Sequence, residues 1–140
     1  VLGVSFAGGF SGAMVGLLAL ILVIFGFTSV SLGLAFQFKK HFEMLAVIMI
    51  VTLPMIFLSS AFAPLEKLPE WLRTAVIFNP VTMAIEPLRM VYTNADWTMT
   101  TTLTTAAGVD LNAWYFFGGL IAFNLLCGRW ARKVLAKKLA

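Results

Sequence analysis

Charged residues are scarce in this sequence of 140 residues: they make up 11% of it, whereas 61% of the residues are hydrophobic. Soluble domains carry about 25% charged and about 45–50% apolar residues. A water-soluble chain this short would have to expose much of its apolar surface, and large exposed apolar patches cause aggregation. The composition therefore predicts an integral membrane protein rather than a soluble domain.

Several kinds of functional residue are missing or single. Cys127 is the only cysteine, which excludes an internal disulfide and a thiolate metal cluster. His41 is the only histidine and stands beside two lysines, where a solvated side chain is the ordinary interpretation. No glycine-rich loop is followed by Lys-Ser/Thr, so the chain has no P-loop for ATP. We predict no metal site and no cofactor in this chain.

Charges are absent from three long apolar runs, which we predict to be transmembrane helices at about residues 13–36, 44–62 and 112–128. A bilayer core of about 30 Å needs about 20 helical residues. Catalysis or proton transfer inside a membrane needs ionisable residues within the spans. Their absence argues against an intramembrane protease, a proton-coupled pump or a haem-binding subunit, so no catalytic residue is predicted.

The start of the chain is apolar and rich in glycine, and it begins with Val1 rather than Met. We expect residues 1–12 to be the end of an earlier span or the turn after it. Small residues form a repeating face here, which consists of Gly8, Gly12, Gly16, Gly26 and Gly33. Such spacing lets helices approach closely. Packing within the protein is the ordinary interpretation of this face, and a dimer seam is the alternative.

Basic residues indicate the orientation. Lys39 and Lys40 separate the first two predicted spans, and five of the ten basic residues lie in the tail, residues 129–140. With three spans both places lie on the same side, and an excess of Lys and Arg marks the cytoplasmic side. We therefore predict a multi-pass protein of the cell membrane with a cytoplasmic C-terminus. Positive charge at span ends reflects contact with the lipid bilayer, so no nucleic-acid partner is predicted.

Between the second and third predicted spans the sequence predicts two short helices at about residues 68–92. Pro69 suits the first turn of one helix, where its missing N–H has no consequence. Asn79 is predicted to cap the second helix, with Pro80 as its first residue. Two short apolar helices joined in this way resemble an external hairpin that re-enters the membrane from one side.

Further details of this region can be predicted from residue spacing. Leu68, Trp71, Leu72, Ala75 and Val76 recur at helical spacing and predict one apolar face. Glu86 and Arg89 are three residues apart and can pair on one helix face. Residues 98–105 include six threonines and are expected to form a loop.

Pro54 lies within the second predicted span and is expected to kink it, because proline removes one backbone hydrogen bond. Membrane helices tolerate this where neighbouring hydroxyl groups satisfy the freed carbonyl. Thr52 and Ser59 are the nearest candidates for that role.

Phe57–Pro64 reads Phe-Leu-Ser-Ser-Ala-Phe-Ala-Pro, Leu68–Leu72 reads Leu-Pro-Glu-Trp-Leu, and Asn79–Thr82 reads Asn-Pro-Val-Thr. These stretches resemble the signature of type-2 ABC transporter permeases, closest to the daunorubicin-resistance-type drug exporters. The positions that match the signature or stand at its departures are Pro54, Ser59, Ser60, Pro64, Leu68, Pro69, Trp71, Asn79, Pro80, Glu86 and Arg89. Ser60 stands where the family usually has glycine, and Pro87 is also less usual.

The resemblance implies a six-span permease of which this chain is the C-terminal half, with spans four to six and the external hairpin between the last two. It implies a separate ATP-binding cassette ATPase, which binds the ATP, and a second permease copy or paralogue. It also implies export of a hydrophobic or amphipathic substrate of the drug, lipid or glycan class. It indicates no substrate-binding residue. A non-transporting structural or assembly subunit of a membrane complex is the alternative.

Overall fold

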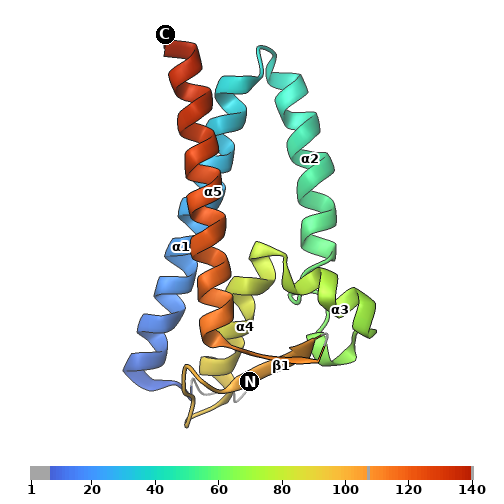
Figure 1. Ribbon diagram of the computed structural model, residues 1–140, viewed down its shortest axis with the longest axis vertical. Coiled ribbons are helices and arrows are strands. Elements are labelled where there is room, and N and C mark those ends of the chain that lie inside the picture. The colour runs from blue at the N-terminus through green and yellow to red at the C-terminus, as the bar shows by residue number, and fades with distance from the viewer. Residues whose placement is uncertain (1–6, 107, 140) are drawn as a thin grey trace, which may run out of the picture.

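The computed structural model describes residues 7–106 and 108–139, which are mainly helical with one small β-hairpin. The elements in chain order are α1 (Gly9–Gln37), α2 (His41–Phe57), the short 3-10 helix η1 (Leu65–Lys67), α3 (Glu70–Ile77), α4 (Pro80–Thr93), β1 (Thr102–Ala106), β2 (Val109–Asn112) and α5 (Ala113–Leu139) (Figure 1).

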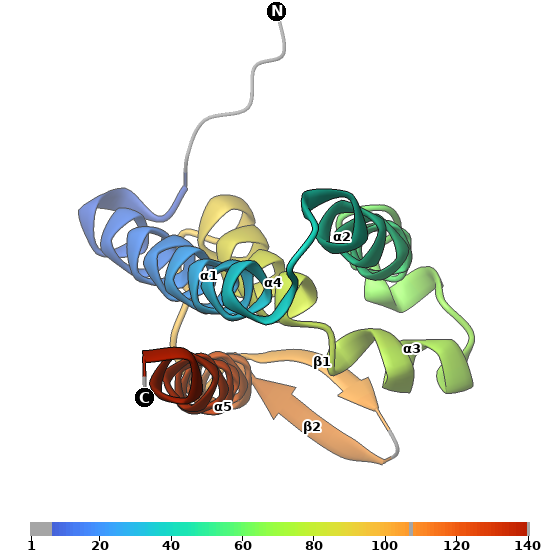
Figure 2. The ribbon, with the colours of Figure 1, turned by 90° about the horizontal axis from the view of Figure 1, so that it is seen from above.

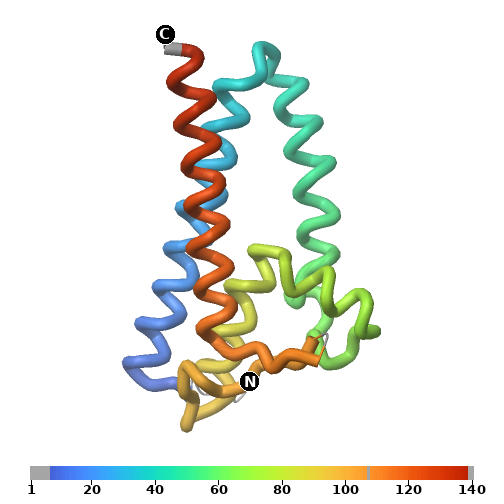
Figure 3. The backbone as a smooth tube through the Cα atoms, viewed as in Figure 1, coloured from blue at the N-terminus to red at the C-terminus, as the bar shows by residue number. Residues whose placement is uncertain are grey.

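Helices α1 and α5 lie side by side, whereas α2 stands apart from both of them (Figures 1 and 2). The backbone tube shows that α1 and α5 run in one direction and α2 runs in the other (Figure 3). The α1–α2 turn and the end of α5 therefore lie together, at what we call the basic end. Helices α3 and α4 and the β-hairpin lie at the opposite end, the hairpin end. The lysine turn and the basic tail thus lie at the same end of the molecule, as expected for three helices that alternate in direction.

Among the described residues, α1 is the one helix that is both long and apolar enough to cross a membrane by length and composition. Its 29 residues extend for about 44 Å. Helix α2 is apolar but has only 17 residues. Helix α5 has 27 residues, and its C-terminal part carries the basic residues. Of the three predicted spans, α1 alone meets both requirements among the described residues. The roles of α2 and α5 as spans are proposals that we take up below.

The helix boundaries differ from the predicted ones. Helix α1 begins at Gly9, so part of the expected N-terminal turn is helical, and residues 1–6 lie outside the described residues. Helix α2 ends at Phe57, before the predicted end at residue 62, and the side chains of Ser59 and Asn79 bond its last carbonyl groups. The predicted tail is helical and continuous with α5, because residues 129–139 contain neither proline nor glycine and are rich in good helix formers.

The core lies at the hairpin end, where α1, α4 and α5 meet. Phe116 and Leu120 of α5 are completely buried there, and Met90 and Val91 of α4 are almost completely buried. Helix α2 contributes no buried residue. Within this chain, α2 is joined to the other elements mainly at its ends (Figure 1).

The glycine face of α1 packs within the protein. Gly12 and Gly16 are buried, and a Cβ atom on Gly16 would lie 2.9 Å from the side chain of Leu88 in α4. A Cβ on Gly26 would lie 2.6 Å from the ring of Phe123, and one on Gly33 would overlap the ring of Trp130. The face is thus covered by α4 and α5, which confirms the interpretation of internal packing over a dimer seam.

We expect the Gly33→Ala substitution to destabilise the protein by about 1–3 kcal/mol, because its methyl group must displace the Trp130 ring. Gly128→Ala is the matched control, since a Cβ on this helical glycine meets nothing within 4 Å. It should be neutral or slightly stabilising, by up to about 1 kcal/mol. Thermal unfolding of both variants in detergent measures the difference. Equal stabilities would show that α1 and α5 are not in contact at Trp130.

The threonine-rich segment, residues 98–105, was expected to be a loop; this holds for residues 98–101, but residues 102–105 belong to strand β1. Strands β1 and β2 pair in an antiparallel hairpin, with Thr104 opposite Leu111 and Thr105 opposite Asp110. Threonine is β-branched and favours strands. The hairpin packs on the α3–α5 side of the core through Ala106 and Leu111.

Candidate functional site: a polar joint between α2 and the helical hairpin

Buried polar side chains are concentrated in one place. Six polar or charged residues are buried among the described ones, and five of these lie just after α2 or in the turn and helix that follow α3. The five, together with the half-buried Arg89, form what we call the hairpin joint: Ser59, Ser60, Asn79, Thr82, Glu86 and Arg89. All of them except Thr82 are positions predicted from the family signature.

Asn79 joins two helices with one side chain. Its Oδ1 atom accepts a hydrogen bond of 2.9 Å from the N–H of Val81, which caps α4 as predicted. Its Nδ2 atom donates to the carbonyl groups of Met55, at 2.6 Å, and Leu58, at 2.9 Å. The last carbonyls of a helix have no partner within the helix. Asn79 therefore caps the end of α2 and the beginning of α4 together.

Ser59 caps a further carbonyl at the end of α2. Its hydroxyl donates to the carbonyl of Ile56 at 2.7 Å. The carbonyl that Pro54 itself deprives of a partner belongs to Ile50, four residues earlier. Ser59 thus stabilises the terminus of α2 rather than the site of the expected kink.

Ser60 is the third contact between the two segments. Its N–H donates to the Thr82 hydroxyl at 3.1 Å, and its carbonyl accepts from Arg89 Nη2 at 2.8 Å. Arg89 Nη1 lies 2.9 Å from Glu86 Oε1, so the predicted ion pair is confirmed. The Glu86 side chain is only 6% exposed. One guanidinium therefore neutralises a buried carboxylate and holds the chain that leaves α2.

Burial raises the pKa of the Glu86 carboxyl above its ordinary value of 4.5, the nearby Arg89 guanidinium offsets part of this, and Glu66 adds to the rise. An acid whose pKa is higher in the folded than in the unfolded state binds more protons when folded. Its contribution to stability is therefore complete below the unfolded-state pKa and is lost as the pH rises through the folded-state value.

We accordingly expect the free energy of unfolding to fall as the pH is raised from about 4.5 through the elevated pKa of Glu86. The Glu86→Gln substitution should remove this part of the pH dependence, because glutamine does not titrate. Unfolding measured across this pH range for both proteins provides the test. A variant that kept the slope of the unaltered protein would assign the effect to another group.

Arg73 connects helix α3 to η1 and to the β-hairpin. The sequence analysis did not identify this residue. Its guanidinium donates to the carbonyls of Leu65 at 3.0 Å, Leu68 at 3.2 Å and Thr105 at 3.1 Å. It thus ties η1 and β1 to α3. The signal was weak, because an arginine in a charged external segment is ordinarily solvated, and Thr105 is 32 residues away in sequence.

The remaining signature positions shape the backbone. Pro64 and Pro69 precede η1 and α3 as their N-cap residues, so Pro69 lies one residue before the first turn in which it was expected. Pro80 is the first residue of α4, as predicted. Leu68 packs against the core. Trp71 lies on α3, where the apolar face was predicted, and it is 74% exposed.

The turn between α3 and α4 also borders two apolar cavities. One, of about 560 Å³, lies between this turn and α5. The other, of about 330 Å³, lies between the turn and α2. Phe78 and Pro80 line both cavities, and Phe78 is 66% exposed. The hairpin joint thus positions the apolar turn at Phe78–Pro80 between the two cavities, one on the α2 side and one on the α5 side.

Comparison with known proteins gives a consistent result. Residues 1–93 match the family described as "ABC-2 type transporter". The protein named "Putative transport permease ycf38" in Cyanophora paradoxa is 34% identical over 126 residues, which are 90% of this chain and 43% of that protein. Its namesake in Porphyra purpurea is 40% identical over 95 residues, which are 68% of this chain and 33% of that protein.

The namesake in Pyropia yezoensis is 34% identical over 122 residues, which are 87% of this chain and 42% of that protein. The chain therefore spans less than half the length of these relatives. No solved structure matches it. The family match covers the whole hairpin joint and both helices that it connects. On the strength of that match, the chain belongs to the ABC-2 type transporter family.

Proposed function

We propose that this chain is part of the membrane-spanning permease of an ATP-driven exporter, which moves a hydrophobic or amphipathic molecule out of the cytoplasm. The drug, lipid and glycan classes all fit this description. A separate ATPase binds and hydrolyses ATP, and a second permease copy or paralogue completes the transporter. The family membership and the relatives named as transport permeases support the proposal.

In this proposal α2 and α5 cross the bilayer beside α1. Helix α2 carries no charge from Met44 to its end at Phe57, and the following residues through Phe62 extend this charge-free run. The apolar part of α5 begins with Trp114 and Tyr115, which suit a membrane–water interface. The basic end lies in the cytoplasm and the hairpin end lies outside. The C-terminus is then cytoplasmic in a multi-pass protein of the cell membrane.

The observation that carries the proposal is the hairpin joint. It fastens α4 to the end of α2 by side chains at the signature positions. Because the same side chains bond both segments, α2 and the helical hairpin move together. A movement that begins at the cytoplasmic turn of α2 is then transmitted to the external hairpin.

The test uses the complete permease, with the segments that its relatives have in addition, and its cognate ATPase in lipid vesicles. Export predicts co-purification of the two and ATP hydrolysis that rises with transported substrates. Asn79→Ala should uncouple hydrolysis from export, whereas Asn94→Ala, at an exposed asparagine, should not. A permease that binds no ATPase would support the alternative, a structural or assembly subunit.

A further inference from the structure

We propose that the cleft between the ends of α1 and α5 at the basic end binds the headgroup of an anionic phospholipid. The proposal rests on the membrane orientation proposed above. The cleft has a volume of about 380 Å³ and is lined by Gln37 of α1 and by Trp130, Val134, Lys137 and Lys138 of α5. It is separate from the hairpin joint, which lies at the other end of the molecule.

The lining combines an apolar wall with two ammonium groups. Trp130, Val134, Lys137 and Lys138 recur at helical spacing, so they share the face of α5 that is turned toward α1. The ring of Trp130 also packs on Gly33 of α1, which fixes one end of the cleft. An amphipathic ligand with an acyl chain and an anionic headgroup matches such a lining.

The charge at this end is strongly positive. The basic residues there are Lys39, Lys40, Arg129, Arg132, Lys133, Lys137 and Lys138, and the one acidic residue of the corresponding described segments is Glu43. Glu43 pairs with Lys40 at 3.9 Å, on the turn. In the part of the chain that the structure describes, Lys137 and Lys138 have no carboxylate within ion-pair distance. Their charges are therefore available to a ligand.

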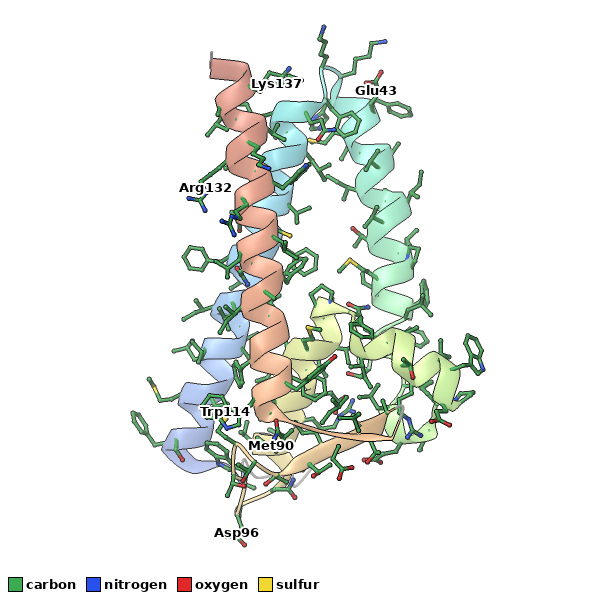
Figure 4. All side chains as sticks on the ribbon, viewed as in Figure 1. Glu43, Met90, Asp96, Trp114, Arg132 and Lys137 are labelled. Atoms are coloured by element: carbon green, nitrogen blue, oxygen red, sulfur yellow. The ribbon has the colours of Figure 1, made fainter. Side chains whose placement is uncertain are left out.

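The side-chain view separates the two sides of α5. Lys137 extends toward the side on which Glu43 lies in the first turn of α2, whereas Arg132 extends away from it (Figure 4). The helix dipole favours lysines in the last turn of α5 and explains part of their occurrence. The preference of basic residues for the cytoplasmic side accounts for Lys39 and Lys40 at the same end. What points to a specific ligand is that Lys137 and Lys138 line the cleft together with the apolar Trp130 and Val134.

The depth of the cleft agrees with a lipid headgroup. Seven residues separate Trp130 from Lys137, which correspond to about 10 Å of helix. The polar layer on each side of a bilayer is about 5–8 Å thick. With Trp130 at the hydrocarbon boundary, the backbone of Lys137 lies just outside this layer, and its long flexible side chain can reach back to the phosphates.

The test measures binding of phosphatidylglycerol and phosphatidylcholine to the complete permease by native mass spectrometry. The unaltered protein should retain phosphatidylglycerol preferentially. The Lys137→Gln/Lys138→Gln double variant should bind it about tenfold more weakly or worse. The matched control is Arg129→Gln/Arg132→Gln, which removes the same charge from α5 but outside the cleft lining. It should change the affinity less than about twofold.

Equal losses in the two double variants would show diffuse attraction to anionic lipid and would overturn the proposal. An unaltered protein without preference for phosphatidylglycerol would overturn it as well. If soluble glycerol phosphate competed as effectively as the lipid, the site would recognise free phosphate instead. If the cleft variant kept the lipid but lost its ATPase, the cleft would be a protein-docking surface. The export proposal survives each of these results, because its own test measures coupling between ATP hydrolysis and transport.

Discussion

Replacement of Asn79 by alanine is expected to lower the free energy of unfolding by about 3 kcal/mol. Three hydrogen bonds of this side chain are lost, each with a net contribution of about 1 kcal/mol. The loss is concentrated where α2 meets α4, because all three bonds lie there. Thermal or denaturant-induced unfolding of the complete permease in detergent measures the effect.

Hydrogen exchange locates the same effect along the chain. In Asn79→Ala, amides near the end of α2 and the first turn of α4 should exchange faster, while those of α1 and α5 should change little. Asn79→Asp separates the two functions of the side chain, because aspartate can still cap α4 but cannot donate to the carbonyls of Met55 and Leu58. It should therefore free the end of α2 and leave α4 protected.

The exposed Asn94 is the control for this prediction. It follows α4 directly, and Asn94→Ala should change stability by less than about 0.5 kcal/mol. Equal stabilities of the Asn79 and Asn94 variants would contradict the proposed double cap. Loss of stability without faster exchange at the end of α2 would show that Asn79 acts on α4 alone.

Replacement of Arg89 by alanine is expected to be the most damaging single change at the joint, with a loss of about 3–5 kcal/mol. The guanidinium neutralises the buried Glu86 carboxylate and also donates to the carbonyl of Ser60. Its removal leaves a buried charge without its counter-ion and a buried carbonyl without its donor. The unfolding assay used for Asn79 measures the loss.

The molecule contains a matched ion pair for comparison. Lys40 and Glu43 are also three residues apart, but their side chains are 78% and 50% exposed and 3.9 Å from each other. Lys40→Ala should therefore change stability by less than about 1 kcal/mol. The double variant Arg89→Ala/Glu86→Gln should regain part of the lost stability, because it has no unpaired buried charge. If it were no better than Arg89→Ala, the main role of Arg89 would be its bond to Ser60.

Local features of the hairpin could be predicted from residue types. Asn79 and Pro80 form a cap and a first helical residue by their own chemistry, and the Glu86–Arg89 pair follows from helical spacing alone. The family signature includes every residue of the hairpin joint except Thr82. It did not show that they touch one another, because partners such as Ser60 and Thr82 are 22 residues apart.

Tertiary context decided what residue spacing could not. The predicted short helix is α3, but Trp71 on it is exposed while Val76 is buried. An eight-residue helix has room to bury only a narrow face, and the core at the hairpin end sets which residues form it. The threonine segment forms a strand because β2 and the core lie beside it, and a single segment does not reveal its partner.

The sequence by itself determined that the protein belongs in a membrane, where its charges lie along the chain, and which family it resembles. These properties depend on composition, on long uncharged runs and on local motifs, all of which are present in the sequence before any tertiary contact forms. Only the tertiary structure decided how α2 is held, since Asn79 and Arg89 contact carbonyl groups 21 to 29 residues away. Backbone carbonyls are the same in every residue, so the sequence carries no signal of which ones a side chain will meet.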